Sequence, residues 1–323
     1  MRGRAVADGF TPLLYLSLAF GLVLLVLGGE ALVRGAVALA ARLGVSPLLI
    51  GLTVVGFGTS TPELVTSLQA AFAGSPGIAV GNVVGSNTAN ILLILGTAAL
   101  IVPVAVSPGA FRRDGGALVL VTLAAVVVVL TGTLSRPAGL ALLAGLVLYL
   151  VFAYRSERRS GAAAANDAVD VPAIGLPLAL LYAAGGIALT VLGARFLVDS
   201  ASEIAARFGV SDAIIGLTLV AVGTSLPELV TSVVASLRRQ GDVAFGNVVG
   251  SNIYNVLGIL GATALIKPIP VPERIAGFDV WVMALATLAL VAVAVTGWRV
   301  TRREGVALLV AYGLYVGWLA LGG

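Results

Sequence analysis

Two glutamates stand in the middle of long apolar stretches of the chain. Glu63 ends the sequence GTSTPE and Glu228 ends GTSLPE. Each motif begins with a glycine, a threonine and a serine, and a proline stands directly before the glutamate. An ionised carboxylate inside hydrocarbon costs about 3 kcal/mol or more unless a partner compensates it, and such residues are usually functional. Two of them at matching places indicate a site that requires negative charge.

The proline of each motif predicts a break in the helix that carries the glutamate. Pro62 has no amide hydrogen and its ring opposes the carbonyl of Gly58, and Pro227 stands in the same relation to Gly223. Inside a membrane, the freed carbonyls must be satisfied by protein, water or an ion. The oxygen donors beside the two breaks are Thr59, Ser60, Thr224, Ser225 and the backbone at Gly56 and Ala221.

A second polar motif accompanies each glutamate. GNVVGSNTAN ends at Asn90 and GNVVGSNIYN ends at Asn255, with Ser86 and Ser251 four residues earlier and so on the same helical face. The other asparagines are either ligands or cross-links between helices, and both readings stay open for Asn82, Asn87, Asn247 and Asn252. Small-xxx-small spacing predicts close helix packing at Gly81, Gly85, Gly246 and Gly250.

These side chains offer only oxygen ligands, because the chain has no histidine and no cysteine. Hard cations prefer such surroundings, and Ca²⁺ takes six to eight oxygens. Two carboxylates neutralise one Ca²⁺, whereas three Na⁺ would leave one excess positive charge. A loaded carrier then crosses more readily than an empty one, which is the logic of obligatory exchange. A moved charge would couple transport to the membrane potential, at about 2.3 kcal/mol per 100 mV.

The composition is that of a membrane protein. Of 323 residues, 59% are hydrophobic and 11% are charged. The net charge is only +4, and the basic residues lie in short breaks between apolar runs, which argues against nucleic-acid binding. Arg2 and Arg4 also fit a secretory signal, but the repeat described next requires the first stretch as a helix. Ten stretches are long enough to span: 11–29, 47–73, 77–102, 115–134, 137–154, 173–198, 213–237, 243–266, 278–298 and 304–321.

The chain contains an internal duplication. Residues 41–67 match 206–232 and residues 81–101 match 246–266, both at an offset of 165. Five spans in each half make the second half enter the membrane from the opposite side. The sequence therefore predicts an all-α membrane protein of ten transmembrane helices in two inverted five-helix repeats with discontinuous core helices, an arrangement typical of secondary transporters.

The polar stretch 155–171 divides the chain into a first repeat, 1–154, and a second, 172–323. Basic residues are more numerous on the face that holds this linker than on the face that holds the termini. The positive-inside rule then predicts a cytoplasmic linker and both termini outside the plasma (inner) membrane. The pairs Glu30/Arg34 and Arg195/Asp199 lie at the same offset, each four residues apart, and are interpreted as local neutralisation, with a gating role as the alternative.

The two motif pairs together resemble those of the calcium/cation antiporter superfamily, particularly the prokaryotic sodium/calcium exchangers. The resemblance implies ten helices in two inverted halves, with ion sites at the midplane between the second, third, seventh and eighth helices. The first and sixth helices would move across this core. It also implies transported Ca²⁺ and Na⁺ in the lipid bilayer, no cofactor, no enzymatic activity and a monomeric transport unit.

The same resemblance assigns roles residue by residue. Glu63 and Glu228 would bind both ions, and Gly56 and Ala221 would offer backbone carbonyls. The hydroxyl ligands would be Thr59, Ser60, Thr224, Ser225, Ser86 and Ser251. Asn90 and Asn255 match the central polar pair, and asparagine in both copies weakens a potassium-dependent reading.

Two other functions fit parts of the pattern. A Ca²⁺/H⁺ antiporter would use the same two glutamates to exchange protons for Ca²⁺. A cation channel would need a continuous acidic ring or a carbonyl filter, and the sequence shows neither. Sodium-driven calcium exchange remains the leading interpretation.

Overall fold

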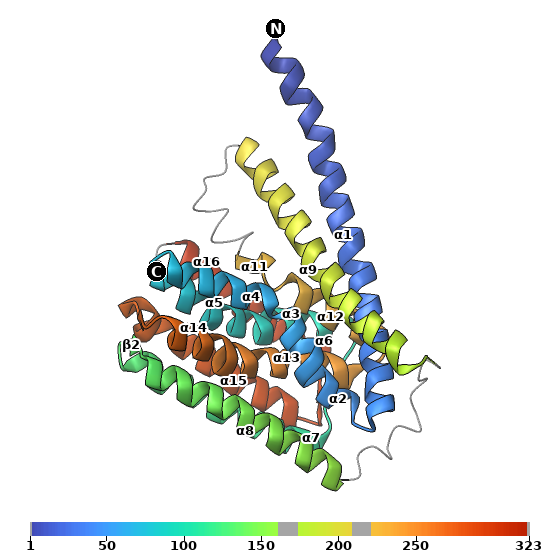
Figure 1. Ribbon diagram of the computed structural model, residues 1–323, viewed down its shortest axis with the longest axis vertical. Coiled ribbons are helices and arrows are strands. Elements are labelled where there is room, and N and C mark those ends of the chain that lie inside the picture. Colours follow the sequence, from blue (N-terminus) through green and yellow to red (C-terminus); the bar gives the residue numbers. More distant parts are fainter. Residues whose placement is uncertain (1, 161–173, 209–220, 322–323) are drawn as a thin grey trace.

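The computed structural model describes residues 2–160, 174–208 and 221–321, and helices dominate all three ranges (Figure 1). The first half contains α1 Arg2–Leu43, α2 Pro47–Ile50, η1 Gly51–Val55, α3 Gly56–Thr59, α4 Thr61–Phe72, α5 Pro76–Ala89, η2 Asn90–Leu95, α6 Gly96–Ile101, β1 Val104–Ala105, α7 Pro108–Leu130, β2 Thr133–Leu134 and α8 Arg136–Ser160. The second contains α9 Leu176–Arg207, α11 Ala221–Gly223, α12 Leu226–Leu237, α13 Gly241–Tyr254, η5 Asn255–Leu260, α14 Gly261–Ile266, β3 Ile269–Pro270, η6 Ile275–Asp279, α15 Val280–Val295, β4 Arg299–Val300 and α16 Arg302–Ala320. Elements marked η are π-helical turns.

The two halves repeat the same elements at the offset seen in the sequence. Helices α4, α5 and α6 and the π-helix η2 have the same bounds as α12, α13, α14 and η5 once 165 is added. The short strands pair across the halves, β1 antiparallel to β4 and β2 antiparallel to β3. Thr122 and Thr287, also 165 apart, hydrogen-bond to each other at 3.1 Å. Equivalent residues thus meet at the centre of the molecule.

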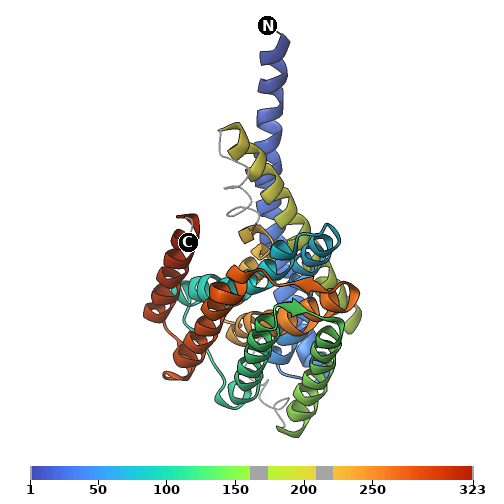
Figure 2. The same ribbon diagram turned by 90° about the vertical axis from the view of Figure 1, so that its left-hand side faces the viewer.

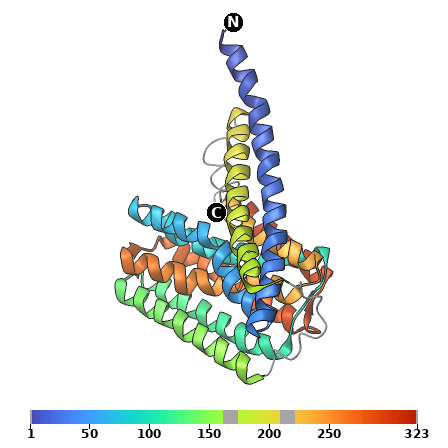
Figure 3. The same cartoon turned by 45° about the vertical axis from the view of Figure 1, so that its right-hand side comes forward.

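Helices α1 and α9 form a separate pair that crosses the bundle and projects beyond it at the end holding the N-terminus (Figures 1, 2 and 3). Their contact is a seam of glycines. A Cβ on Gly35 would lie 2.5 Å from the Ala183 nitrogen, and one on Gly186 would lie 2.4 Å from the Leu32 nitrogen. Backbones this close leave no room for side chains between them, so the two helices form one tightly packed unit.

The apolar spans of the structure agree with the sequence in part. In the described ranges, seven helices are long and apolar enough to cross a membrane, and an eighth span results if the bent pair Pro47–Thr59 and Thr61–Phe72 counts as one. The first span is longer than the predicted 11–29, because α1 continues to Leu43. Residues 213–220 of the predicted span 213–237 lie outside the described residues, and the rest of the span contains α11 and α12. The predicted ten spans are therefore not all observed.

The first residues of the predicted linker 155–171 are helical. Helix α8 continues to Ser160, and Glu157 is buried against Arg113 of α7 with Glu157 Oε2 2.9 Å from Arg113 Nη1. Charge and small residues suggested a loop, but the buried ion pair holds this segment in the helix. Residues 161–171 lie outside the described residues.

Close packing at the predicted glycines is confirmed in the second half. A Cβ on Gly250 would lie 2.2 Å from the carbonyl oxygen of Leu52, and one on Gly246 would lie 2.6 Å from that of Leu48. These contacts seat α13 against α2 and η1 of the first half. Gly81 has its nearest neighbour at 3.6 Å. The residues of the second half that match Leu48 and Leu52 lie outside the described ranges.

We expect Gly250→Ala to destabilise the protein strongly. The added methyl group meets backbone rather than a mobile side chain, so α13 must move away from η1, and overpacking of this kind costs about 1–3 kcal/mol. Gly313→Ala is the control, because no described atom lies within 4 Å of a Cβ there in the exposed part of α16. Thermal unfolding in detergent measures both, and equal midpoints would contradict the packing argument.

Candidate functional site

The helix break predicted at the first proline motif is confirmed. Helix α3 ends at Thr59 and α4 begins at Thr61, and the helical run Pro47–Thr59 is bent by 43° relative to Thr61–Phe72. The carbonyl of Gly56 accepts hydrogen bonds from the Ser60 amide at 3.2 Å and from the Ser251 hydroxyl at 3.2 Å. The carbonyl of Gly58 accepts one from Thr61 Oγ1 at 2.8 Å. Hydroxyl groups thus satisfy two of the carbonyls that the sequence left open.

The two glutamates lie buried at the start of the helices that follow the breaks, Glu63 in α4 and Glu228 in α12, and each is 1% exposed. Each carboxylate accepts a hydrogen bond from a serine of the other half. Ser60 Oγ donates to Glu228 Oε1 at 2.8 Å, and Ser225 Oγ donates to Glu63 Oε1 at 3.0 Å. The break of one half therefore contacts the acid of the other.

The hydroxyl residues of the second motif join the same cluster. Ser225 Oγ lies 3.4 Å from Ser86 Oγ, and Ser251 reaches the carbonyl of Gly56. Thr59 Oγ1 lies 3.2 Å from Asn247 Oδ1 and donates to the carbonyl of Val55 at 3.0 Å. The structure thus brings serine and threonine hydroxyls from α3, α5, α13 and the two breaks around the pair of glutamates.

Two asparagines fix the helices that carry the glutamates. Asn82 Nδ2 donates to the Glu63 carbonyl at 3.0 Å and to Ser67 Oγ at 2.9 Å. Asn247 Nδ2 donates to the Glu228 carbonyl at 3.1 Å and to Ser232 Oγ at 2.9 Å. Their amides therefore cross-link α4 to α5 and α12 to α13. Ser67 and Ser232 were not among the predicted site residues, although both end the repeated ELVTS, a signal from which they could have been found.

Asn87 also cross-links helices, whereas the Asn252 side chain donates to the Val248 carbonyl of its own helix at 2.7 Å. Asn87 Nδ2 donates to the carbonyl of Asn252 at 3.2 Å, and Asn255 Nδ2 donates to Asn87 Oδ1 at 3.0 Å. Asn90 differs from these residues. Its side chain is buried, and in the described part of the chain neither its amide nitrogen nor its oxygen has a hydrogen-bond partner.

Several buried oxygens of the cluster have no hydrogen-bond partner among the residues that the structure describes. They are the second carboxylate oxygens, Oε2, of Glu63 and Glu228 and the side-chain oxygens of Asn90, Asn252 and Asn255. No ion pair reaches either glutamate within the described ranges. An unpaired buried polar atom costs about 1–3 kcal/mol, and more when it is charged. A cation bound between the two glutamates would satisfy their unpaired Oε2 atoms.

Two predicted site residues are less well placed by the structure. Ala221 begins α11, and Thr224 follows that helix just before Ser225. The segment preceding Ala221 lies outside the described residues, so the backbone on one side of this break is not seen. The remaining predicted residues belong to the two buried motifs described above.

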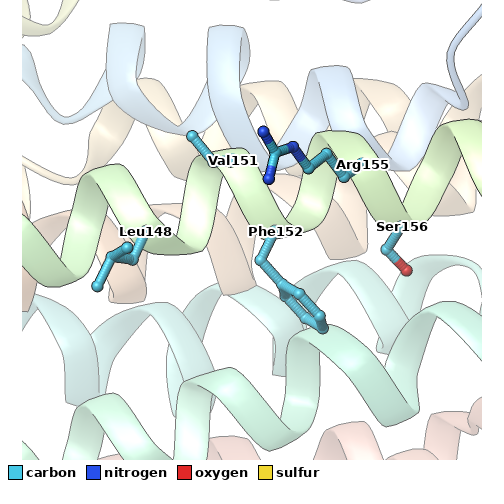
Figure 4. A pocket seen from close by; sticks show the side chains of 5 residues that line it. All are labelled: Leu148, Val151, Phe152, Arg155 and Ser156. Atoms are coloured by element: carbon cyan, nitrogen blue, oxygen red, sulfur yellow. The ribbon is translucent and has the colours of Figure 1, made fainter.

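A pocket elsewhere on the surface does not compete with this cluster. It lies on the outer face of α8 and is lined by Leu148, Val151, Phe152, Arg155 and Ser156 (Figure 4). None of these residues is a carboxylate or an amide. The pocket therefore offers no cation site.

Comparison with known proteins decides the family. The family model described as "Sodium/calcium exchanger protein" matches residues 13–155 and 178–321. The chain belongs to the sodium/calcium exchanger family. This is a family of membrane transporters, and the apolar helices agree with an integral membrane protein.

Relatives of this exchanger-family chain match it over most of its length. It is 39% identical over 299 residues to "Putative antiporter CaxA" of Alkalimonas amylolytica, covering 90% of this chain and 94% of the relative. It is 35% identical to "Sodium/calcium exchanger MaX1" of Methanosarcina acetivorans, covering 92% and 96%. A structure of the sodium-calcium exchanger NCX_Mj soaked with Na⁺ and Ca²⁺ superimposes with a TM-score of 0.82 at 32% identity, covering 94% of this chain and 98% of that one.

Proposed function

We propose that this chain exchanges Na⁺ for Ca²⁺ across the membrane. The observation that carries the proposal is the pair of buried glutamates, each held by a serine of the opposite half and each keeping one carboxylate oxygen without a partner. Two carboxylates match the charge of one Ca²⁺, and oxygen ligands suit both ions. Membership in the sodium/calcium exchanger family supports the choice of ions.

The proposed ligands share oxygen donors and a place around the two helix breaks. Glu63 and Glu228 supply the charge, and Asn90 and Asn255 supply amide oxygens between them. The hydroxyl and carbonyl donors are Thr59, Ser60, Thr224, Ser225, Ser86, Ser251, Gly56 and Ala221. Ca²⁺ and Na⁺ are cargo here, so the proposal includes no resident cofactor. Three Na⁺ against one Ca²⁺ would make the exchange electrogenic.

The proposed mechanism is alternating access between two inverted repeats. Residues 1–154 and 172–323 would each supply five of ten transmembrane helices, joined by the linker 155–171, of which residues 155–160 form the end of α8. The shared element bounds and the self-pairing of Thr122 with Thr287 support a pseudo-two-fold relation between the halves. We propose a cytoplasmic linker, both termini outside, and a single chain as the transport unit, since the cluster is built from one chain.

The test is uptake of Ca²⁺ into proteoliposomes. Vesicles loaded with Na⁺ and diluted into Na⁺-free medium containing Ca²⁺ should accumulate Ca²⁺, and vesicles with Na⁺ on both sides should not. With three Na⁺ leaving for each Ca²⁺ that enters, one net positive charge leaves the vesicle in each cycle, so a positive-inside potential set with K⁺ and valinomycin should speed the uptake and a negative-inside potential should slow it. Uptake that ignores the Na⁺ gradient would refute the proposal.

A proton-coupled exchanger is the second candidate. The observation in its favour is that no cationic side chain pairs with either glutamate within the described ranges, so that protons could neutralise the empty site as well as Na⁺ could. Uptake of Ca²⁺ driven by a pH gradient in Na⁺-free medium would select this function. Its absence, together with Na⁺-driven uptake, would leave sodium coupling.

A further inference from the structure

Helix α1 is tied to the core by an ion pair that joins residues far apart in the sequence. Glu30, in the middle of α1, accepts from Arg238 Nε at 2.9 Å through Oε2, and its Oε1 lies 2.6 Å from Arg238 Nη2. Arg34, one turn further along α1, also contacts this carboxylate. Arg238 directly follows α12, the helix that carries Glu228. The pair therefore links α1 to a helix of the candidate site.

The other half of the chain cannot form the equivalent pair. Adding 165 to Glu30 gives Arg195, and subtracting 165 from Arg238 gives Ala73. An arginine facing an alanine makes no ion pair. Arg195 instead pairs at 3.7 Å with Asp199 of its own helix, and both side chains point away from the protein, 79% and 72% exposed.

The packing beneath the ion pair also differs between the two halves, since α1 packs against α12 more closely than α9 packs against α4. Gly29 of α1 seats on α12, where a Cβ would lie 3.1 Å from Val230 Cγ1 and 3.3 Å from Val234 Cγ2. The equivalents of these valines on α4 are Val65, 46% exposed, and Gln69, also exposed. Within the described ranges, no side-chain hydrogen bond or ion pair joins α9 to α4. Helix α1 thus covers this face of α12, whereas α9 leaves the equivalent face of α4 exposed. We call the covered arrangement closed.

We propose that Glu30 and Arg238 form a latch that exists in only one of the two access states and biases the resting exchanger toward it. In an inverted repeat, the second state arises when the halves exchange conformations. Helix α9 would then close on α4 and α1 would leave α12, which breaks the latch. Because Arg195 and Ala73 stand at the matching positions, nothing replaces it. The inference rests on the alternating access proposed above.

The expected bias is modest. Partly exposed ion pairs contribute little each, but this carboxylate is held by two arginines, one of them through two nitrogens. We expect loss of the latch to raise the population of the second state about 2- to 10-fold. An effect of this size changes transport rates only slightly, so the access state itself must be measured.

The chain has no cysteine, which makes single-cysteine labelling direct. Val234→Cys places a thiol under α1 and Gln69→Cys places one on the uncovered face of α4. In purified full-length protein in detergent, both ends of the molecule are open to a soluble maleimide. Adding Arg238→Gln should raise the labelling rate at position 234 about 2- to 10-fold and lower it at position 69 by a smaller factor.

Arg195→Gln is the matched control, because it removes the equivalent charge from the half without a latch. Glu30→Gln should reproduce the effect of Arg238→Gln, and the double variant should add little to either, as expected for two partners of one interaction. Unchanged labelling at position 234 in Arg238→Gln, or an equal change in Arg195→Gln, would overturn the proposal. Labelling needs no ion gradient, so this result and that of the uptake assay can fail independently.

Discussion

Glu63→Gln is expected to abolish Ca²⁺ transport, and Glu228→Gln is expected to do the same. Each change keeps the side-chain volume and leaves an oxygen to accept from the serine of the other half, so the cross-contacts are retained. The charge is lost. Two unit charges about 4 Å apart interact by about 4 kcal/mol at an effective dielectric constant of 20, which corresponds to a loss of affinity of about 1,000-fold.

Stability separates a lost site from a lost fold. Removing an uncompensated buried charge should leave the melting temperature of the ion-free protein unchanged or raise it. Ca²⁺ should raise the melting temperature of the parent protein and not that of the two variants. Glu203→Gln, a change in an exposed pair with Arg207 on α9, should keep both transport and the Ca²⁺ shift. Full transport by Glu63→Gln and Glu228→Gln would remove these residues from the proposed site.

The cross-contacts would couple the two glutamates within the proposed site. Ser60 belongs to the break of the first half and contacts the acid of the second, while Ser225 does the reverse. A cation bound between the acids would therefore be sensed by both breaks at once. A movement of one half past the other changes both contacts, which provides a physical link between occupancy and access.

The parts of the molecule that the sequence predicts are those repeated at a fixed offset. Glu63 and Glu228 can be predicted as functional residues because carboxylates are costly in apolar stretches of a membrane protein. Pro62 predicts the bend because it removes a backbone hydrogen-bond donor. The structure places both acids in one buried cluster, as the duplication requires. Local chemistry and the repeat together were sufficient for these residues.

The parts that escape prediction depend on contacts between distant segments. The π-helices that begin at Gly51, Asn90 and Asn255 have no local signature, since one extra residue per turn is set by packing. The pairing of Glu30 with Arg238 joins residues that share no motif. The helical course of residues 155–160 was missed because charged residues suggested a loop, although Glu157 is buried by a partner 44 residues away.

That partner lies in a second buried charge cluster, away from the glutamate pair. Arg113 of α7 binds both oxygens of Asp114 at 2.8 Å and reaches Glu157 of α8 at 2.9 Å, and these three side chains are at most 8% exposed. Glu157 Oε1 also accepts from the backbone amide of Ser46 at 2.9 Å, and Tyr149 donates to Asp114 at 3.3 Å. One arginine thus compensates two buried acids and fixes the turn between α1 and α2.

Arg113→Met is expected to lower the free energy of unfolding by about 3–5 kcal/mol, because it leaves two acids buried without their cation. The methionine keeps much of the aliphatic stem, so the loss reports charge rather than volume. Thermal unfolding in detergent measures the effect, with Arg112→Met, an exposed neighbour in the same helix, as the control.

Adding Glu157→Gln to Arg113→Met should recover part of the stability, since one of the two uncompensated charges is removed while the contact to Ser46 is kept. Two outcomes would contradict the view that Arg113 holds α7, α8 and the α1–α2 turn together by compensating these acids. One is that Arg112→Met is as destabilising as Arg113→Met, and the other is that adding Glu157→Gln recovers no stability.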